Sequence, residues 1–145
     1  MDLRQITPDF AVAPQIETED LQALANAGYR AVICNRPDDE VGGDLNSQMM
    51  SQHAAEAGLA FHYLPYYPGA MTPELVAEFE TALATIDGPV FAYCRSGTRS
   101  SHLWAMSQAG HRPTQEILSL AAEAGYDNRA MAGLLESHGA QRSAK

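Results

Sequence analysis

Residues 90–108 of the chain read VFAYCRSGTRSSHLWAMSQ. The first four form a short, fully apolar run, which is typical of a strand buried on both faces of a sheet. A helical pattern then extends from about Thr98 to Gln108. The segment between them, which contains Cys94 and Gly97, is therefore predicted to be the turn from a strand into a helix.

The same alternation recurs along the rest of the chain. Apolar runs predict three further strands, over residues 10–13, 31–34 and 59–64. Helical patterns are found over residues 17–27, 45–57, 73–86, 114–124 and 128–137. Thr18 and Thr72 are the expected N-caps of the first and third of these helices. Strands separated by helices are best joined by right-handed parallel crossovers. The sequence thus predicts a three-layer α/β sandwich with a mostly parallel sheet of four or five strands.

Length and charge restrict the class of protein. The chain has 145 residues, and we expect one domain over residues 1–140 with a frayed tail over 141–145. Its formal net charge of −9 disfavours nucleic acids but does not exclude a local site for a small anion. No apolar stretch approaches the roughly 20 residues needed to cross a bilayer, and no signal peptide is visible. We therefore expect a cytoplasmic protein without membrane contact, in which Cys34 and Cys94 are free thiols.

Ligands of parallel α/β sheets bind at the edge where the carboxyl ends of the strands meet. Three segments leave the predicted strands at that edge, over residues 35–39, 65–69 and 94–99. We therefore look for the site among these residues.

Cys94 is the expected nucleophile. At the turn into a helix it faces several backbone N–H groups and the positive end of the helix dipole, and both favour the thiolate. Gly97 allows the loop amides to curl inward as an anion nest, and Arg99 can fork two hydrogen bonds to an oxyanion. Ser100 is placed to donate a hydrogen bond to the thiolate or to a leaving sulfur. The remaining expected anion-binding residues of the loop are Arg95, Ser96 and Thr98. The plainer alternative is a buried structural cysteine beside a surface arginine.

The other two segments contribute weaker candidates. Asp38 or Asp39 could act as an acid and Arg36 could hold an anionic acceptor, unless residues 37–39 are a turn of solvated charges. Tyr66 could donate its hydroxyl group to a ligand or pack as an apolar ring.

Three further residues complete the candidates. Arg95 is expected to point outward, either solvated or in contact with an anionic partner such as glutathione. Cys34 is either inert core filler or a resolving thiol. His62 lies in no metal-ligand spacing, so we expect neither a metal nor a cofactor.

These residues resemble known families. The pattern Cys94, Gly97, Arg99 is similar to the active-site loop of rhodanese-type sulfurtransferases. The order of elements resembles cysteine phosphatases of the protein-tyrosine and dual-specificity type. Over residues 1–110, including 35–40 and 94–100, the chain resembles a bacterial family, the phosphatase-like domain of beta-lactamase-hydrolase-like proteins. That domain occurs alone or fused to a persulfide dioxygenase-like metallohydrolase. The resemblance implies a role in sulfide or persulfide metabolism, with a persulfide dioxygenase as a partner.

Two departures from the phosphatase pattern favour sulfur chemistry. Four residues separate Cys94 from Arg99, where phosphatases have five, and residues 64–69 contain no carboxylate to serve as general acid. Sulfur transfer to a thiol needs no such acid, because thiolates leave easily. We therefore expect a sulfurtransferase that forms a Cys94 persulfide from a small persulfide or thiosulfate and passes the sulfur to a small thiol, sulfite or cyanide. The alternatives are a phosphatase with a phosphocysteine at Cys94 and a non-catalytic docking module.

Overall fold

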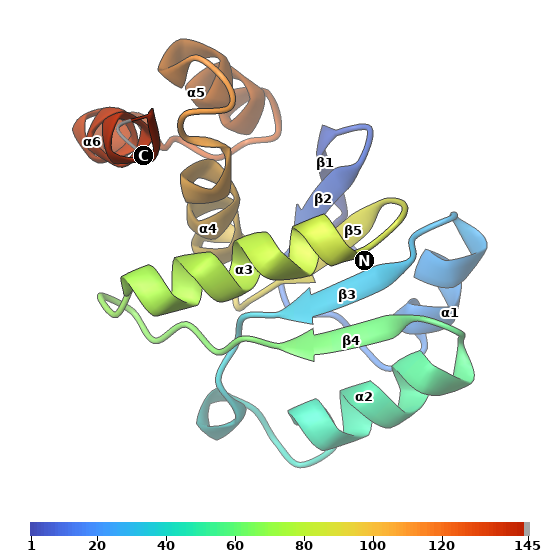
Figure 1. Ribbon diagram of the computed structural model, residues 1–145. Coiled ribbons are helices and arrows are strands. Elements are labelled where there is room, and N and C mark those ends of the chain that lie inside the picture. Colours follow the sequence, from blue (N-terminus) through green and yellow to red (C-terminus); the bar gives the residue numbers. More distant parts are fainter. Residues whose placement is uncertain (144–145) are drawn as a thin grey trace.

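The computed structural model describes residues 1–143 and is built on one five-stranded sheet (Figure 1). In space the strands follow the order β1-β2-β5-β3-β4. Strand β1 pairs antiparallel with β2, and the other neighbours pair in parallel. The bounds are β1 Arg4–Thr7, β2 Phe10–Ala13, β3 Ala31–Cys34, β4 Ala60–Tyr63 and β5 Val90–Tyr93. The predicted α/β fold with a mostly parallel sheet is confirmed.

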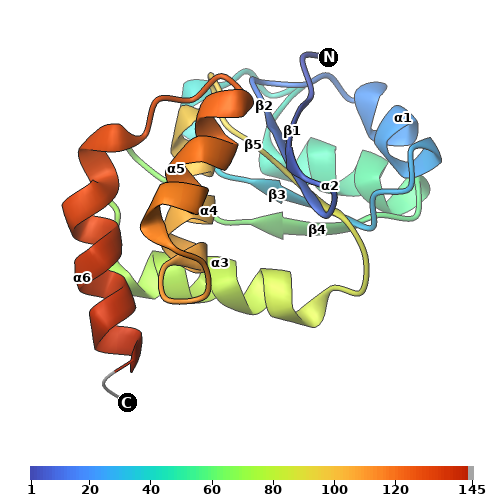
Figure 2. The ribbon, with the colours of Figure 1, turned by 90° about the horizontal axis from the view of Figure 1, so that it is seen from above.

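Helices cover both faces of the sheet (Figures 1 and 2). On one face lie α1 and α2, and on the other lie α3, α4, α5 and α6, with α5 and α6 beyond α4. The bounds are α1 Asp20–Asn26, α2 Ser47–Glu56, α3 Pro73–Thr85, α4 Thr98–Gln108, α5 Thr114–Glu123 and α6 Ala132–Ser143. Two 3₁₀ turns, η1 Asp38–Glu40 and η2 Arg129–Met131, complete the elements. Within residues 1–143, no helix combines the length and the apolar character that crossing a membrane requires.

The alternation of side chains along the strands produces two cores. Every residue of β2, β3 and β5 is buried, because these strands are apolar throughout and helices cover both of their faces. Val12, Ile33 and Ala92 face the core beneath α3 and α4, while Val32 and Phe91 face α1 and α2. Because β5 is the central strand, the loop that follows it starts from a strand that is paired on both sides.

Helix starts follow local hydrogen bonds. Thr72 caps α3 as predicted, because its hydroxyl oxygen accepts the Leu75 N–H at 3.1 Å and Pro73 occupies the first turn. The predicted cap at Thr18 is wrong, since α1 begins only at Asp20. The Asp20 carboxylate accepts the Glu17 N–H at 2.8 Å and closes a turn ahead of the helix.

The two ends of the chain differ from the prediction. Strand β1 was not expected, because Ile6 is its only buried residue and leaves little apolar pattern. Helix α6 continues through Ser143, so residues 141–143 of the expected tail are helical, whereas Ala144 and Lys145 lie outside the described residues. Arg142 holds this end of the helix by donating to the Ala109 carbonyl at 2.7 Å and pairing with Glu80.

Candidate active site

The three segments expected at the carboxyl edge of the sheet are joined there by Asn35, which is fully buried. Its backbone N–H donates to the Tyr93 carbonyl at 2.8 Å, and its side-chain amide donates to the Leu64 carbonyl at 2.9 Å. Its own carbonyl accepts the Tyr66 N–H at 2.9 Å. Asn35 thus ties the ends of β3, β4 and β5 together, a role that sequence analysis did not assign to it.

Cys94 lies at the base of the loop between β5 and α4. The residue is buried, and its Sγ accepts a hydrogen bond from the Gly97 N–H at 3.1 Å. Gly97 is the N-cap of α4 and has φ +91°, a left-handed conformation that glycine adopts without strain. An amide donor and a helix N-terminus are the surroundings that a nucleophilic cysteine requires, and the Cys94 loop supplies both.

Arg99, in the first turn of α4, is held at both terminal nitrogens of its guanidinium. Nη1 donates to Glu40 Oε2 at 3.1 Å and to the Tyr66 carbonyl at 2.6 Å, while Nη2 donates to Glu40 Oε1 at 2.8 Å. A guanidinium has five N–H groups. Within residues 1–143 the Nε–H and the second Nη2–H have no acceptor, and these two point the same way. Arg99 therefore presents a free two-donor edge suited to an oxyanion.

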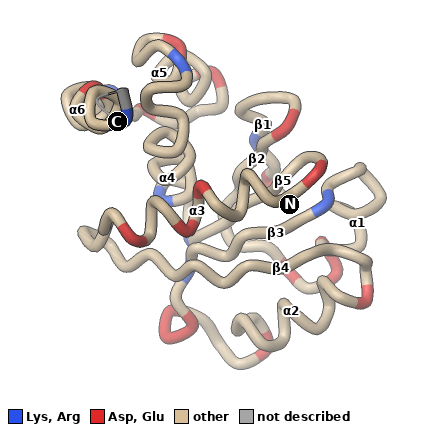
Figure 3. The backbone as a smooth tube through the Cα atoms, in the orientation of Figure 1, with Lys and Arg blue, Asp and Glu red and all other residues tan. Residues whose placement is uncertain are grey.

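Glu40, at the end of η1, is a site residue that sequence analysis missed. Hydrogen bonds from Arg99 hold the pKa of its carboxyl group below the ordinary range, with Arg36 adding a second contribution. Figure 3 shows η1 as an acidic loop beside the carboxyl end of β3. Asp38, Asp39 and Glu40 are consecutive acidic residues, and no local sequence pattern indicates which of the three contacts Arg99.

Arg36 faces Glu40 and Gln15. Its Nε lies 3.4 Å from Glu40 Oε1, its Nη2 donates to the Glu40 carbonyl at 3.0 Å, and its Nη1 donates to Gln15 Oε1 at 3.2 Å. These bonds fix η1 in place, and the expected grip of Arg36 on an anionic acceptor stays a prediction.

The two expected acids have different environments. Asp38 accepts the backbone N–H and the hydroxyl of Ser47, both at 2.7 Å, so both carboxylate oxygens are committed to the start of α2. This argues against the acid role that we expected of Asp38. Asp39 is exposed, and among residues 1–143 the one side chain that donates to it is Tyr67, whose hydroxyl lies at 3.1 Å.

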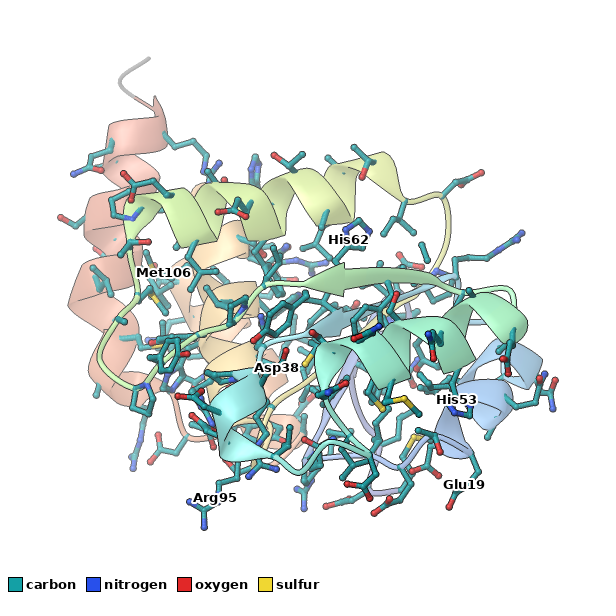
Figure 4. All side chains as sticks on the ribbon, turned by 90° about the horizontal axis from the view of Figure 1, so that it is seen from below. Glu19, Asp38, His53, His62, Arg95 and Met106 are labelled. Carbon is teal, nitrogen blue, oxygen red and sulfur yellow. The ribbon has the colours of Figure 1, made fainter. Side chains whose placement is uncertain are left out.

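The smaller residues of the loop form two groups. Ser100 is buried and donates to Asn35 Oδ1 at 2.8 Å, so its hydroxyl proton is directed to Asn35 and not to Cys94 as expected. Ser96 and Thr98 are exposed and joined by a hydrogen bond of 3.1 Å between their hydroxyl groups. Arg95 is exposed and extends away from the protein body (Figure 4).

Comparison with known proteins shows the family to which the chain belongs. The sequence model of the beta-lactamase hydrolase-like protein, phosphatase-like domain, matches residues 2–111. The chain belongs to this family. The beta-lactamase hydrolase-like protein of Xylella fastidiosa (strain Temecula1 / ATCC 700964) is 31% identical over 129 residues, which cover 88% of this chain but 30% of the relative. The chain thus spans about a third of the length of that relative.

Solved structures share the fold of this phosphatase-like domain. A candidate phosphatase, nma1982 of Neisseria meningitidis Z2491, superposes with a TM-score of 0.81 at 29% identity and covers 95% of this chain and 99% of its own. PTPMT1 superposes with a TM-score of 0.75 at 15% identity, over 98% and 96% of the two chains. The predicted family and cysteine-phosphatase-like fold are confirmed. These neighbours support the phosphatase interpretation of function and give no support to the sulfurtransferase interpretation.

Two further residues of the expected site, Tyr66 and Cys34, are buried, and burial limits the chemistry of their side chains. Tyr66 contributes its carbonyl to Arg99, while its ring is packed in the core and its pKa is raised by burial. Burial also raises the pKa of Cys34 to about 11, and its Sγ donates to the Arg36 carbonyl oxygen at 3.4 Å. Cys34 is therefore a thiol at neutral pH, consistent with core filler, and both cysteines are free.

Proposed function

We propose that this domain is a cysteine-dependent hydrolase of phosphate monoesters. The observation that carries the proposal is that one loop supplies both an amide donor to the Cys94 sulfur and an arginine side chain held in a fixed orientation. Cys94 Sγ accepts the Gly97 amide, and Arg99 is locked by Glu40 with its Nε edge free. The fold of the neighbours supports the same conclusion.

The reaction has two steps. The Cys94 thiolate attacks the phosphorus atom and forms a phosphorus–sulfur bond, while the bond from phosphorus to the ester oxygen breaks. The oxygen leaves with the electron pair and takes up a proton from water. Loop amides and Arg99 stabilise the charge on the phosphoryl oxygens. The oxygen of a water molecule then attacks phosphorus, and the phosphorus–sulfur bond breaks with its electron pair on Cys94 Sγ. This step regenerates the thiolate and releases inorganic phosphate and a proton to solvent.

The absence of a carboxylate from residues 64–69 limits the substrates. Of the two acids expected from the sequence, Asp39 is the remaining candidate, and it is exposed and accepts a hydrogen bond from the Tyr67 hydroxyl. Weak acid assistance favours leaving groups that depart as stable anions, so aryl phosphates are expected to react faster than alkyl phosphates.

Turnover of 4-nitrophenyl phosphate and of a simple alkyl phosphate tests the proposal. We expect release of phosphate from the aryl ester, its loss in Cys94→Ser, and rates within about twofold of the parent in Cys34→Ser, the matched control. Turnover that survives in Cys94→Ser would reject the proposal.

One observation favours a second function, sulfur transfer. The loop has one residue fewer between Cys94 and Arg99 than the cysteine phosphatases it resembles, and a tighter cradle suits a single sulfur atom. Incubation with thiosulfate separates the two functions. A one-sulfur adduct on Cys94 that cyanide removes, without phosphate release from either ester, would replace the phosphatase with a sulfurtransferase.

A further inference from the structure

Tyr126 lies in the turn after α5, beyond the residues 2–111 that match the family. It is nevertheless in direct contact with the Cys94 loop. Tyr126 is 7% exposed, and its hydroxyl donates to the Ser96 carbonyl at 3.3 Å. No loop of the sequence-predicted site includes this residue.

The bonded carbonyl belongs to the peptide group that also carries the Gly97 N–H. In a planar trans peptide the C=O and N–H point in opposite directions. Tyr126 therefore holds one end of this group, at the Ser96 oxygen, while the other end donates to Cys94 Sγ at 3.1 Å. Rotation of the peptide would break both hydrogen bonds together.

We propose that Tyr126 is a positioning residue that fixes the Ser96–Gly97 peptide with its N–H directed at the Cys94 sulfur. The need for glycine at position 97 supports this role. Besides its left-handed φ, Gly97 has no room for a Cβ atom, which would collide with the Tyr126 hydroxyl. The Cys94 loop thus packs against a side chain from the C-terminal third of the chain.

Tyr126 is itself held in place from the N-terminus. The Arg4 guanidinium of β1 lies over its ring, 5.7 Å from the centroid, and donates to the Ala124 carbonyl at 3.1 Å. Burial raises the pKa of Tyr126, so its hydroxyl stays protonated and able to donate across the neutral range. Strand β1 and the turn after α5 together form the support of the loop.

The test is the pH profile of Cys94 alkylation by iodoacetamide, measured on the full chain with Cys34→Ala so that one thiol remains. Tyr126→Phe keeps the ring and removes only the donor. We expect the midpoint of the profile to rise by about half to one pH unit, because one hydrogen bond that fixes the amide at the thiolate is lost. Tyr29→Phe is the matched control, since Tyr29 packs on Phe91 away from the loop, and its profile should not move. A Tyr126→Phe profile that superposes on the parent would overturn the proposal.

A second readout separates positioning from folding. Tyr126→Phe and Tyr29→Phe should change the thermal unfolding midpoint by similar small amounts, whereas Tyr126→Leu, which also removes the ring, should unfold earlier. The inference rests on the proposed function only in making Cys94 the nucleophile, and alkylation uses no substrate. A shifted profile in a protein that hydrolyses no phosphate ester would keep the role of Tyr126 and reject the phosphatase. If turnover occurs, Tyr126→Phe should lower kcat about three- to tenfold with little change in KM.

Discussion

The ends of β3 and β5 are neighbours in the sheet and carry the same two residue types. Cys34 closes β3 with Arg36 two residues later, and Cys94 follows β5 with Arg99 five residues later. Both cysteines are buried, yet the Cys34 thiol faces a carbonyl while the Cys94 sulfur accepts an amide N–H. Burial raises the pKa of Cys34 to about 11, whereas the distinctive feature of Cys94 is the amide N–H that its sulfur accepts.

Arg36 and Arg99 also differ in the partners of their guanidinium groups. Arg36 uses its donors to fasten η1 to Gln15, whereas Arg99 is fastened by Glu40 and keeps one edge free. A residue type at the end of a strand therefore indicates little until its partners are known. The following changes are designed to break or sharpen this contrast.

The largest expected difference is in the reactivity of the two thiols. At pH 7 a thiol with a pKa of about 11 is ionised in roughly one molecule in 10⁴. We expect iodoacetamide to modify Cys94 at least about 10³-fold faster than Cys34 in the folded protein, as measured by peptide mass spectrometry. The difference should vanish after unfolding in denaturant. Equal rates in the folded protein would contradict the assignment of the nucleophile.

The next largest difference is expected between the lysine replacements of Arg99 and Arg36. Arg99→Lys keeps the charge but loses the two-donor edge, and we expect kcat/KM for 4-nitrophenyl phosphate to fall about 10²- to 10³-fold. Arg36→Lys, which alters only the support of η1, should cost less than about tenfold. A larger loss in Arg36→Lys than in Arg99→Lys would reverse the roles given to the two residues.

Glu40→Gln tests how Arg99 is held. The loss of the ion pair should reduce kcat/KM about tenfold, since the guanidinium keeps its charge but loses its orientation. Because the pKa of Glu40 is lowered in the folded state, its contribution to stability is present above the unfolded value of about 4.3 and is lost as pH falls through the folded value. Denaturant unfolding should thus find the parent more stable than Glu40→Gln at pH 7, with the difference closing in acid. A difference independent of pH would argue against an ionised Glu40.

The smallest expected differences are in the free energy of unfolding of the Asp38 and Asp39 variants. Asp38→Asn weakens two hydrogen bonds at the start of α2 and should lower the free energy of unfolding by about 2 kcal/mol while leaving turnover nearly unchanged. Asp39→Asn, at an exposed carboxylate, should change stability by less than about 0.5 kcal/mol. A strong loss of turnover in Asp38→Asn would restore the acid role that sequence analysis gave it.

The difference between local patterns and long-range contacts explains which features could be predicted from the sequence. The apolar runs of β2, β3 and β5 and the turn at Cys94 are local patterns, so the sheet and the loop from β5 into α4 could be predicted. Strand β1 could not, because it holds one buried residue, Ile6. Glu40 and Tyr126 were missed because each acts across the fold, on Arg99 and on the Ser96–Gly97 peptide. Such contacts have no sequence spacing to find.

The measurement that tests the central claim most directly is an acid quench of the protein during turnover of 4-nitrophenyl phosphate, followed by peptide mass spectrometry. The account predicts one phosphoryl group on the peptide that contains Cys94, none on the peptide that contains Cys34, and no adduct in Cys94→Ser. Phosphate release that continues in Cys94→Ser, or turnover by the parent protein without any phosphocysteine, would contradict it.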